Sequence, residues 1–435
     1  MARKMKDSGI EWIGEIPEGW ETINPKALFT QRKDRASKGE RQLTSSQQYG
    51  ILYQDDYMEL TGSKVVTVEK DFDILKHVEA GDFVISMRSF QGGLEYSTNS
   101  GAISSAYVML VPNLELVYPR FYRWLLKSSV YIDALQRTTN MVRDGQAMRY
   151  SNFAQVRLFT LPLDEQKSRA DFLDLECSSI DKILFKTRSS IEEYKKLKQA
   201  VITQAVTKGV RGEREMKDSG VEWIGEIPKY WNIGKLKYYW ISVESGVSVN
   251  AADRPIDNPA QYGVLKTSSV SKFIFNPHEH KQVNNDEYSR VTCPVTADCI
   301  IVSRMNTPDL VGACGYVEKT YPNLFLPDRL WQISFKNDVS AKFIWYYLNN
   351  KMVRSYISSL STGTSSTMQN ISQGQFGNIS VCLPDSNEQK EIADYLDAKC
   401  AEIDKLIAKK EQLVKELESY KKSLIYEVVT GKREV

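Results

Sequence analysis

The chain has 435 residues, of which 42% are hydrophobic and 26% charged, and its formal net charge is +2. These proportions exclude a disordered chain, and no apolar run approaches the ~20 residues that span a bilayer. The small net charge neither indicates nor excludes a nucleic-acid partner, because acidic surface elsewhere can balance a basic face. An N-terminus without an apolar signal core favours a cytoplasmic location, and six cysteines without a CxxC pair favour reduced thiols.

The first predicted element is a block that occurs twice. MKDSGIEWIGEIPEGWE at residues 5–21 returns as MKDSGVEWIGEIPKYWN at residues 216–232, with 13 of 17 positions identical. Such close identity within one chain indicates an internal duplication. Two fused copies of a unit usually approximate a two-fold axis, so we expect a two-part target or two copies of a partner.

A stretch with scattered matches follows each block. QYGILY at 48–53 corresponds to QYGVLK at 261–266, and the strand-like GDFVISMRS at 81–89 corresponds to ADCIIVSRM at 297–305. Between these matches the two copies share almost nothing. A common scaffold with divergent loops is what two related recognition domains with different targets would show.

Each copy continues with a segment of helical periodicity. Residues 118–135 and 340–357, aligned on Phe121 and Phe343, predict one amphipathic helix in each copy. A polar segment that contains glycine follows each of these helices, and its composition is typical of a loop.

Each copy ends with an LP sequence, an EQ pair and a long stretch without glycine or proline. The stretch reaches Gly209 in the first copy and Gly431 in the second, and it predicts two helices of about 40 residues, each about 60 Å long. We expect Asp164 and Ser386 to be the N-caps, with Gln389 completing a capping box in the second copy.

The apolar residues of the two long helices follow a 4–3 spacing. Ten positions in the first helix, raised by 223, give ten positions in the second, and eight of the ten are apolar in both. A sustained 3.5-residue repeat indicates a coiled-coil seam, which a two-fold axis would make antiparallel. Packing of each helix on its own globular domain is the alternative. The seam positions are Leu173, Cys177, Ile180, Leu184, Thr187, Ile191, Tyr194, Lys198, Val201 and Ala205, with the counterparts Leu396, Cys400, Ile403, Ile407, Lys410, Val414, Leu417, Lys421, Leu424 and Val428.

This plan resembles the specificity subunit of type I restriction–modification systems. The resemblance covers nearly the whole chain and rests on the repeated WIGEIP–W block, the LP–EQ–I–D helix starts and the two long helices. It implies an α+β fold, in which two globular α/β target-recognition domains are separated by two long helices that form an antiparallel coiled coil, with a pseudo-two-fold axis from internal duplication. The implied recognition domains are 1–160 and 213–382, and the helical spacers are 161–212 and 383–435.

The resemblance also implies a function. The chain would be a sequence-specific subunit that reads a split sequence in double-stranded DNA and directs two methyltransferase subunits and the restriction (motor-nuclease) subunits. S-adenosylmethionine, ATP and Mg would serve those partners, with no cofactor in this chain and no membrane partner. A non-DNA coiled-coil scaffold that recruits two copies of a partner protein is the alternative. It accounts for the repeated segments but not for the divergent ones.

Motifs for catalysis are missing from the sequence. Asp257-Asn258-Pro259 is followed by Ala260 rather than by the Pro-aromatic pair of an amino-methyltransferase, and no G-x-G follows a strand. Residues 384–390 imitate a nuclease motif, but they start a predicted helix. Two histidines and three cysteines between residues 278 and 314 match no zinc module. We therefore expect a subunit that is not an enzyme and holds no metal.

Side chains that contact DNA are expected on the divergent loops. Arginine pairs with guanine, asparagine or glutamine pairs with adenine, and basic residues also bind phosphates. A surface turn or a flexible linker is the alternative at each loop. The candidates after the matched strands are Arg88, Ser89, Phe90 and Gln91, with Arg304, Asn306 and Thr307; those in the polar segments are Arg143, Gln146 and Arg149, with Thr364, Ser365, Ser366, Thr367 and Gln369; a third group is Lys266, Thr267 and Ser268.

Overall fold

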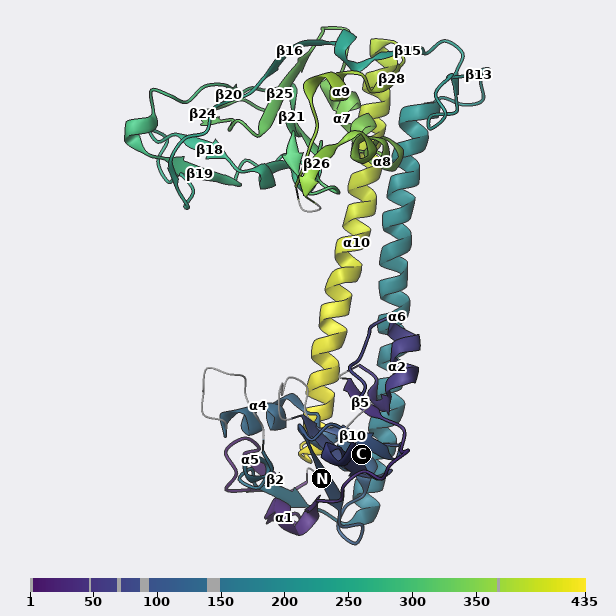
Figure 1. Cartoon of the computed structure of the whole chain (residues 1–435), viewed down its shortest axis with the longest axis vertical. Coiled ribbons are helices and arrows are strands. Elements are labelled where there is room, and N and C mark those ends of the chain that lie inside the picture. Colours follow the sequence, from purple (N-terminus) through teal and green to yellow (C-terminus); the bar gives the residue numbers. More distant parts are fainter. Residues whose placement is uncertain (1–2, 47, 69–71, 87–93, 139–148, 366–367) are drawn as a thin grey trace. The chain divides into compact units, whose positions relative to one another are not determined.

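The computed structural model describes residues 3–46, 48–68, 72–86, 94–138, 149–365 and 368–435. It divides into two compact units, each of which contains part of both long helices (Figure 1). Unit 1 comprises Met1–Arg188 and Glu411–Val435, and unit 2 comprises Ser189–Lys410. The sequence prediction of four consecutive domains stays a prediction.

The globular part of unit 1 is built from antiparallel strands. A hairpin of β1 (Met5–Asp7) and β2 (Glu15–Pro17) comes first, and a four-stranded sheet in the order β4-β11-β8-β9 forms the centre. That sheet consists of β4 (Phe29–Arg32), β11 (Tyr107–Pro112), β8 (Phe83–Ser86) and β9 (Glu95–Tyr96). Three strand pairs complete it: β3 (Glu21–Ile23) with β12 (Leu158–Thr160), β5 (Leu43–Ser46) with β6 (Gly50–Tyr53), and β7 (Lys76–Val78) with β10 (Gly101–Ile103).

Short helices connect and cover the strands of unit 1. They are α1 (Pro25–Leu28), α2 (Gln54–Thr61), the 3-10 turn η1 (Phe72–Ile74), α3 (Pro119–Leu126), α4 (Ser129–Arg137) and α5 (Tyr150–Phe153). The α3 side chains Phe121, Tyr122 and Leu125 are fully buried in the main apolar core of this unit.

Unit 2 begins with the same arrangement. A hairpin of β13 (Met216–Asp218) and β14 (Glu226–Pro228) precedes the pair β15 (Asn232–Lys235) and β28 (Ser380–Leu383). The central four-stranded sheet has the order β16-β25-β21-β23. Its strands are β16 (Trp240–Glu244), β25 (Leu330–Phe335), β21 (Cys299–Ser303) and β23 (Cys314–Val317).

Unit 2 then adds two sheets of its own. The larger is ordered β17-β19-β18-β24-β20, with β17 (Ala251–Ala252), β19 (His280–Val283), β18 (Gly263–Leu265), β24 (Tyr321–Phe325) and β20 (Pro294–Val295). The smaller is ordered β22-β27-β26, with β22 (Met305–Asn306), β27 (Met368–Asn370) and β26 (Thr362–Ser365). The remaining elements are η2 (Leu236–Tyr238), η3 (Thr267–Val270), η4 (Asn285–Glu287), α7 (Ala341–Asn349), α8 (Lys351–Leu360) and α9 (Gln373–Gly377).

The predicted mixture of helices and strands is confirmed, but the single amphipathic helix in each copy is wrong. Residues 118–135 and 340–357 each contain a break between two helices, at Ser128 and at Asn350. Asn350 has an extended backbone, and its side-chain oxygen accepts from the N–H groups of the first turn of α8. A short polar side chain that caps a new helix in this way competes with helix continuation.

The two long helices are α6 (Leu163–Lys208), with 46 residues, and α10 (Ser386–Val429), with 44 residues. The predicted N-caps are wrong by one or two residues. Asp164 lies inside the first turn of α6, and Ser386 is the first helical residue of α10. The cap of α10 is Asp385, whose carboxylate accepts from the Glu388 N–H at 2.9 Å.

Both long helices end where glycine was expected to end them. Gly209 and Gly431 each have φ +77°, which only glycine adopts without strain. A Cβ at Gly431 would lie 2.5 Å from the Pro17 ring, and one at Gly209 would lie 1.9 Å from the Arg214 guanidinium. The end of each helix is therefore packed tightly against a repeated block or the residues just before it.

Within each unit the segments of α6 and α10 run antiparallel. In unit 1, Lys421 pairs with Asp181 at 2.6 Å, and in unit 2, Lys198 pairs with Asp404 at 2.6 Å. All twenty predicted seam positions are buried or half-buried, which confirms the seam. The two ion pairs are matched, because Lys421 and Asp404 are Lys198 and Asp181 raised by 223.

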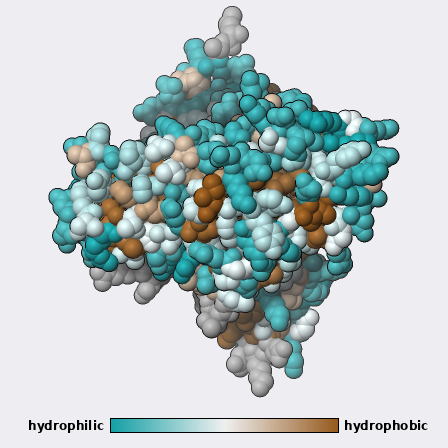
Figure 2. Space-filling model, turned by 90° about the horizontal axis from the view of Figure 1, so that it is seen from above, coloured by the Kyte–Doolittle hydropathy of each residue, from teal (hydrophilic) through white to brown (hydrophobic). Residues whose placement is uncertain are grey.

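The surface seen in Figure 2 is mostly hydrophilic, with hydrophobic residues in separate small areas. Among the described helices, none combines the length and the apolar character that a bilayer crossing requires.

Candidate nucleic-acid interface

A buried glutamine ties the start of each long helix to the chain ahead of the short helices. In unit 1, the Gln166 side chain accepts from the Tyr118 N–H at 2.7 Å and donates to the carbonyls of Leu116 and Leu161 at 2.8 and 2.9 Å. The matching contacts of Gln389 in unit 2 are to the Ser340 N–H at 2.8 Å and to the carbonyls of Asp338 and Pro384 at 3.1 and 3.0 Å. The amide of Gln389 is thus committed to these bonds, and the predicted capping box is wrong.

The glutamate before each glutamine binds the second tryptophan of the repeated block. Trp20 donates from its indole nitrogen to Glu165 at 3.1 Å, and Trp231 donates to Glu388 at 3.3 Å. An arginine just before each block completes the contact. Arg3 binds Glu165 at 3.0 Å, and Arg214, which is position 3 raised by 211, binds Glu388 at 2.7 Å.

Unit 1 adds a second arginine to this contact. The Arg169 side chain is 2% exposed, binds Glu165 at 2.8 Å and donates to the Val428 carbonyl at 2.8 Å. Burial raises the pKa of Glu165, but hydrogen bonds from Arg3, Arg169 and Trp20 outweigh burial and lower that pKa to about 2.

An aspartate about two turns further along each long helix binds the short helix in front of it. The contacts are Asp174 with Arg120 at 2.9 Å and Trp124 at 2.7 Å in unit 1, and Asp397 with Lys342 at 2.6 Å and Tyr346 at 2.8 Å in unit 2. We call the repeated blocks, the long helices and these glutamine, glutamate and aspartate contacts the frame. It recurs in both units with matched residues.

The small sheet of unit 2 brings two groups of predicted DNA-contacting residues together. Asn306 on β22 is paired with Gln369 on β27, and β27 pairs in turn with β26, which contains Thr364 and Ser365. These segments lie about 60 residues apart in the sequence. The sheet aligns their backbones side by side, with Asn306 directly opposite Gln369.

The other second-copy candidates lie close to this sheet or beside the larger one. Thr307 is exposed just after β22, and Arg304 precedes β22, with its backbone N–H bound to the Arg329 carbonyl at 3.1 Å. Lys266 pairs with Asp253 at 3.5 Å, and the Ser268 hydroxyl donates to Glu279 at 2.7 Å. Lys266, Thr267 and Ser268 adjoin the five-stranded sheet, where carboxylates already engage two of them.

Most first-copy candidates lie outside the described residues. These are Arg88, Ser89, Phe90, Gln91, Arg143 and Gln146, together with Ser366 and Thr367 of the second copy. Arg149 is described: it is exposed and precedes α5, where its backbone N–H donates to Asn152 at 3.0 Å. It stays a candidate on exposure alone.

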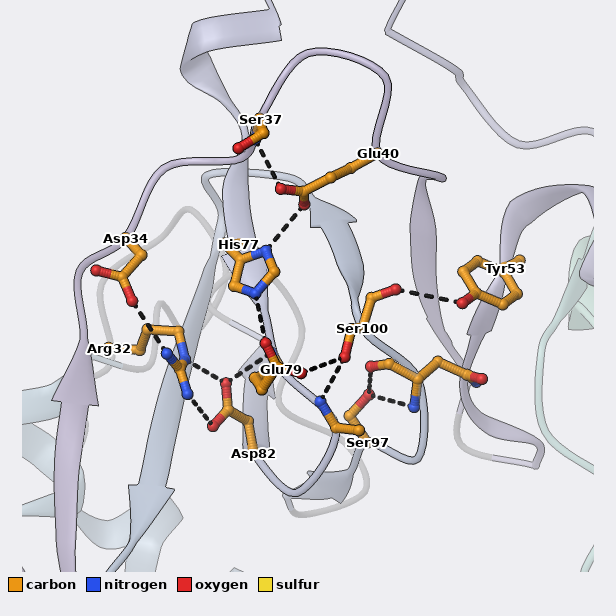
Figure 3. A network of polar contacts seen from close by, with 12 residues as sticks. Arg32, Asp34, Ser37, Glu40, Tyr53, His77, Glu79, Asp82, Ser97 and Ser100 are labelled. Atoms are coloured by element: carbon orange, nitrogen blue, oxygen red, sulfur yellow. Dashed lines mark hydrogen bonds and ion pairs between the residues drawn. The ribbon is translucent and has the colours of Figure 1, made fainter.

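Unit 1 holds its own divergent strands with a network of charged side chains (Figure 3). His77 on β7 lies between Glu40 and Glu79, at 2.9 and 3.0 Å from their oxygens, and Ser100 donates to Glu79 at 2.6 Å. Burial lowers the pKa of His77, but the two carboxylates outweigh burial and raise it. The His77 ring therefore bridges the loop before β5 and the loop after β7.

A second part of the same network fixes the edge of the central sheet. Arg32 at the end of β4 binds the buried Asp82 through two nitrogens, at 2.7 and 3.1 Å, and Asp34 at 3.0 Å. Figure 3 shows Arg32 between these two carboxylates. The Arg32 guanidinium is therefore engaged by carboxylates of its own unit.

Arg329 is a residue that the sequence did not single out. It is exposed on the turn before β25, and no carboxylate of the described residues forms an ion pair with it. Its proximity to Arg304 comes from the alignment of β21 with β25, where Ser303 is opposite Leu330. Only the strand register, which the sequence does not display, brings these two arginines together.

Among the described residues, no group of three or more His, Cys, Asp or Glu side chains is placed to hold a metal ion.

Comparisons with known proteins point to one family. Residues 261–416 match the family described as Type I restriction modification DNA specificity domain. The chain is 25% identical over 432 residues to the type I restriction enzyme MjaVIII specificity subunit of Methanocaldococcus jannaschii, covering 96% of this chain and 93% of that one. It is 26% identical over 173 residues to the EcoEI specificity subunit of Escherichia coli, covering 40% of this chain and only 29% of that one.

A solved structure shares the fold. It comes from work on complex assembly and conformational transition of the type I R-M system, has a TM-score of 0.70 at 12% identity, and is matched over 96% of this chain and 99% of that one. The resemblance inferred from the repeated blocks is thus confirmed. Over nearly its whole length the chain is similar to specificity subunits of type I restriction–modification systems.

Proposed function

We propose that this chain is a non-catalytic DNA-binding subunit that reads a split sequence in double-stranded DNA. Each unit would read one half of the target. The proposal rests on one observation above all: the frame is built from matched contacts in both units, whereas the polar surfaces that it supports differ. Two readers of different half-sites require a common support and unlike contact surfaces.

The polar surface of β22, β27 and β26 suits base recognition in the second half-site. An asparagine or glutamine amide pairs with adenine in the major groove, and arginine pairs with guanine. Asn306, Gln369 and Arg304 supply these groups within one small sheet and its approach. Arg88, Gln91, Arg143, Gln146 and Arg149 are the proposed counterparts for the first half-site.

The long helices are proposed as spacer and docking surface. The matched pairs Lys421–Asp181 and Lys198–Asp404 support an origin by duplication with a pseudo-two-fold axis. On α6, Leu175, Ile183 and Phe185 are 67%, 47% and 73% exposed. Apolar side chains in such numbers on one helix suit a protein partner, and we propose two methyltransferase subunits, with the restriction subunits joining them.

Single-molecule sequencing of DNA from a host that carries the intact system tests the proposal. The expected result is methylated adenines in one motif made of two short specified parts and a spacer of fixed length. Removal of one heptad from both α6 and α10 is expected to change the spacer length and leave both specified parts unchanged. A contiguous motif, or no motif that depends on this chain, would contradict the proposal and favour a scaffold without DNA recognition.

A further inference from the structure

The loop after β22 in unit 2 is held by a half-buried residue on another element, Arg354. The loop runs from Thr307 to Gly312, directly after Asn306. Within it, the Thr307 carbonyl accepts from the N–H groups of Leu310 and Val311 at 3.0 and 2.9 Å. The loop is therefore a compact turn whose conformation determines the position of its first residues.

Arg354 on α8 holds this turn through hydrogen bonds to its backbone. One of its terminal nitrogens donates to the carbonyls of Asp309 and Val311, at 3.1 and 2.7 Å, and its guanidinium lies 5.1 Å from the centre of the Phe273 ring. Among the described carboxylates, none forms an ion pair with it. A cation that binds only main-chain carbonyls and a ring acts as a clamp on the backbone.

Two further contacts between α8 and the turn add to the hold of Arg354. The Ser358 hydroxyl, one helical turn after Arg354, donates to the Pro308 carbonyl at 3.1 Å. Gly312 has φ +68°, and a Cβ there would lie 2.6 Å from Ile357 and 3.3 Å from Arg354. Because α8 touches the turn without space for a methyl group, the turn has one position against the helix.

The turn also orients the side-chain amide of Asn306. The Asn306 oxygen accepts from the Thr307 N–H at 2.9 Å, and its nitrogen donates to Ser303 at 3.3 Å. An amide has two donor hydrogens and two acceptor lone pairs, so one of each is left for a ligand. That remainder is the set that binds adenine through two hydrogen bonds.

We propose that Arg354 is a positioning residue that sets the base preference of Asn306 in the second half-site. In this proposal Arg354 does not contact the DNA itself. It holds the turn through main-chain carbonyls, and the turn positions Thr307, whose N–H donates to the Asn306 side chain. This inference rests on the proposed function, since it assigns one residue a role within the surface that reads the second half-site.

The test compares variants of the whole chain in its natural complex, with the host chromosome as the probe and the methylated motif as the readout. Arg354→Met keeps the length of the side chain and removes its donors. We expect methylation of cognate sites relative to single-base variants to fall about tenfold at one or two positions of one half of the motif, with the other half unchanged. Arg354→Lys retains the charge but not the fork, and we expect it to restore the preference only in part.

Two more variants complete the design. Ser358→Ala removes one bond to the turn and is expected to loosen the same positions more weakly. Arg290→Met is the matched control, because Arg290 binds Glu287 and the Ser248 carbonyl in the same unit but not the turn. We expect its motif to equal that of the wild type.

Three results would overturn the inference. They are an unchanged motif in Arg354→Met, a loss that is equal at all sites and fully restored by Arg354→Lys, and relaxation in both halves. If Arg354→Met fails to fold, Ser358→Ala decides: the same relaxed positions support the inference, and an unchanged motif refutes it. A wild-type complex without any split motif would instead refute the proposed function.

Discussion

The frame is stabilised by the same contacts in both units, whereas the divergent parts that it supports are stabilised by different ones. In the frame, the two units use matched residues for matched bonds, as Gln166 and Gln389 or Asp174 and Asp397 show. In the supported parts they use different chemistry. Unit 1 fixes its divergent strands with the ionic network around His77 and Arg32, and unit 2 fixes its turn with an arginine bound to carbonyls.

This difference separates two requirements. A surface that must meet the same partner twice is constrained to stay alike in both copies, and a surface that meets two unlike targets is not. The described divergent parts are nevertheless each held by hydrogen bonds or ion pairs, as a reading surface must hold its groups in place. The two units thus share a support and differ in how each recognition surface is stabilised.

Exchange of a supported part should give the largest effect. When residues 22–160 are replaced by the equivalent region of a relative, we expect one half of the recognised motif to change completely and the other half to stay. Sequencing of methylated adenines measures both halves at once. A change in both halves would show that the frame also reads DNA.

Equivalent substitutions in the frames of the two units should lower the stability of each unit by a similar amount. Trp20 and Trp231 are 0% and 1% exposed, so Trp20→Ala and Trp231→Ala should each destabilise their own unit by about 3–5 kcal/mol. Hydrogen exchange followed by mass spectrometry reports the loss separately for each unit. Clearly different losses of stability in the two variants would contradict the equivalence of the two frames. So would a loss of protection in the unit that does not carry the substitution.

The ionisation of Glu165 should make unit 1 sensitive to acid. Because its pKa is lowered to about 2, the charged form stabilises the folded state fully above pH 4.5 and progressively less as the pH falls toward 2. We expect Glu165→Gln to cost about 1–2 kcal/mol at pH 7, less than the full pKa shift would give because solvent screens the partly exposed carboxylate, and we expect this difference in stability to close in acid. Urea unfolding at several pH values measures it, with the exposed Glu115→Gln as control. A gap independent of pH would mean that packing, not charge, is lost.

The matched ion pairs between the long helices should matter least. Lys198→Met and Lys421→Met each remove a pair whose aspartate is more than half exposed, so each should cost about 0.2–1 kcal/mol. High salt should reduce that cost further. Equal small shifts in the urea midpoint would sharpen the match between the helices, and a large shift in one variant alone would contradict it.

Repetition made the frame predictable. The helices, their ends at Gly209 and Gly431 and the buried seam all follow from features that occur twice in the sequence. The errors arose where a single side chain decides the local backbone. Asp385 rather than Ser386 caps α10, and Asn350 splits a segment whose apolar pattern continues across it.

The candidate site was predictable only in parts. The segments around Asn306 and Gln369 were chosen separately for their polar composition, but their pairing in one sheet was not foreseen. Strand pairing depends on residues distant in the sequence, and neither periodicity nor repetition marks it here. Arg329 and Arg354 were missed for the same reason, since their contacts are made across the fold.

The glutamine contacts of the frame have a consequence for how such a chain can change. Gln166 and Gln389 grip only main-chain N–H and carbonyl groups of the segments that they hold. These hydrogen bonds depend on the path of the backbone and not on the side chains along it. A newly acquired segment of unrelated sequence is therefore held at once, provided that it enters and leaves at the same two points.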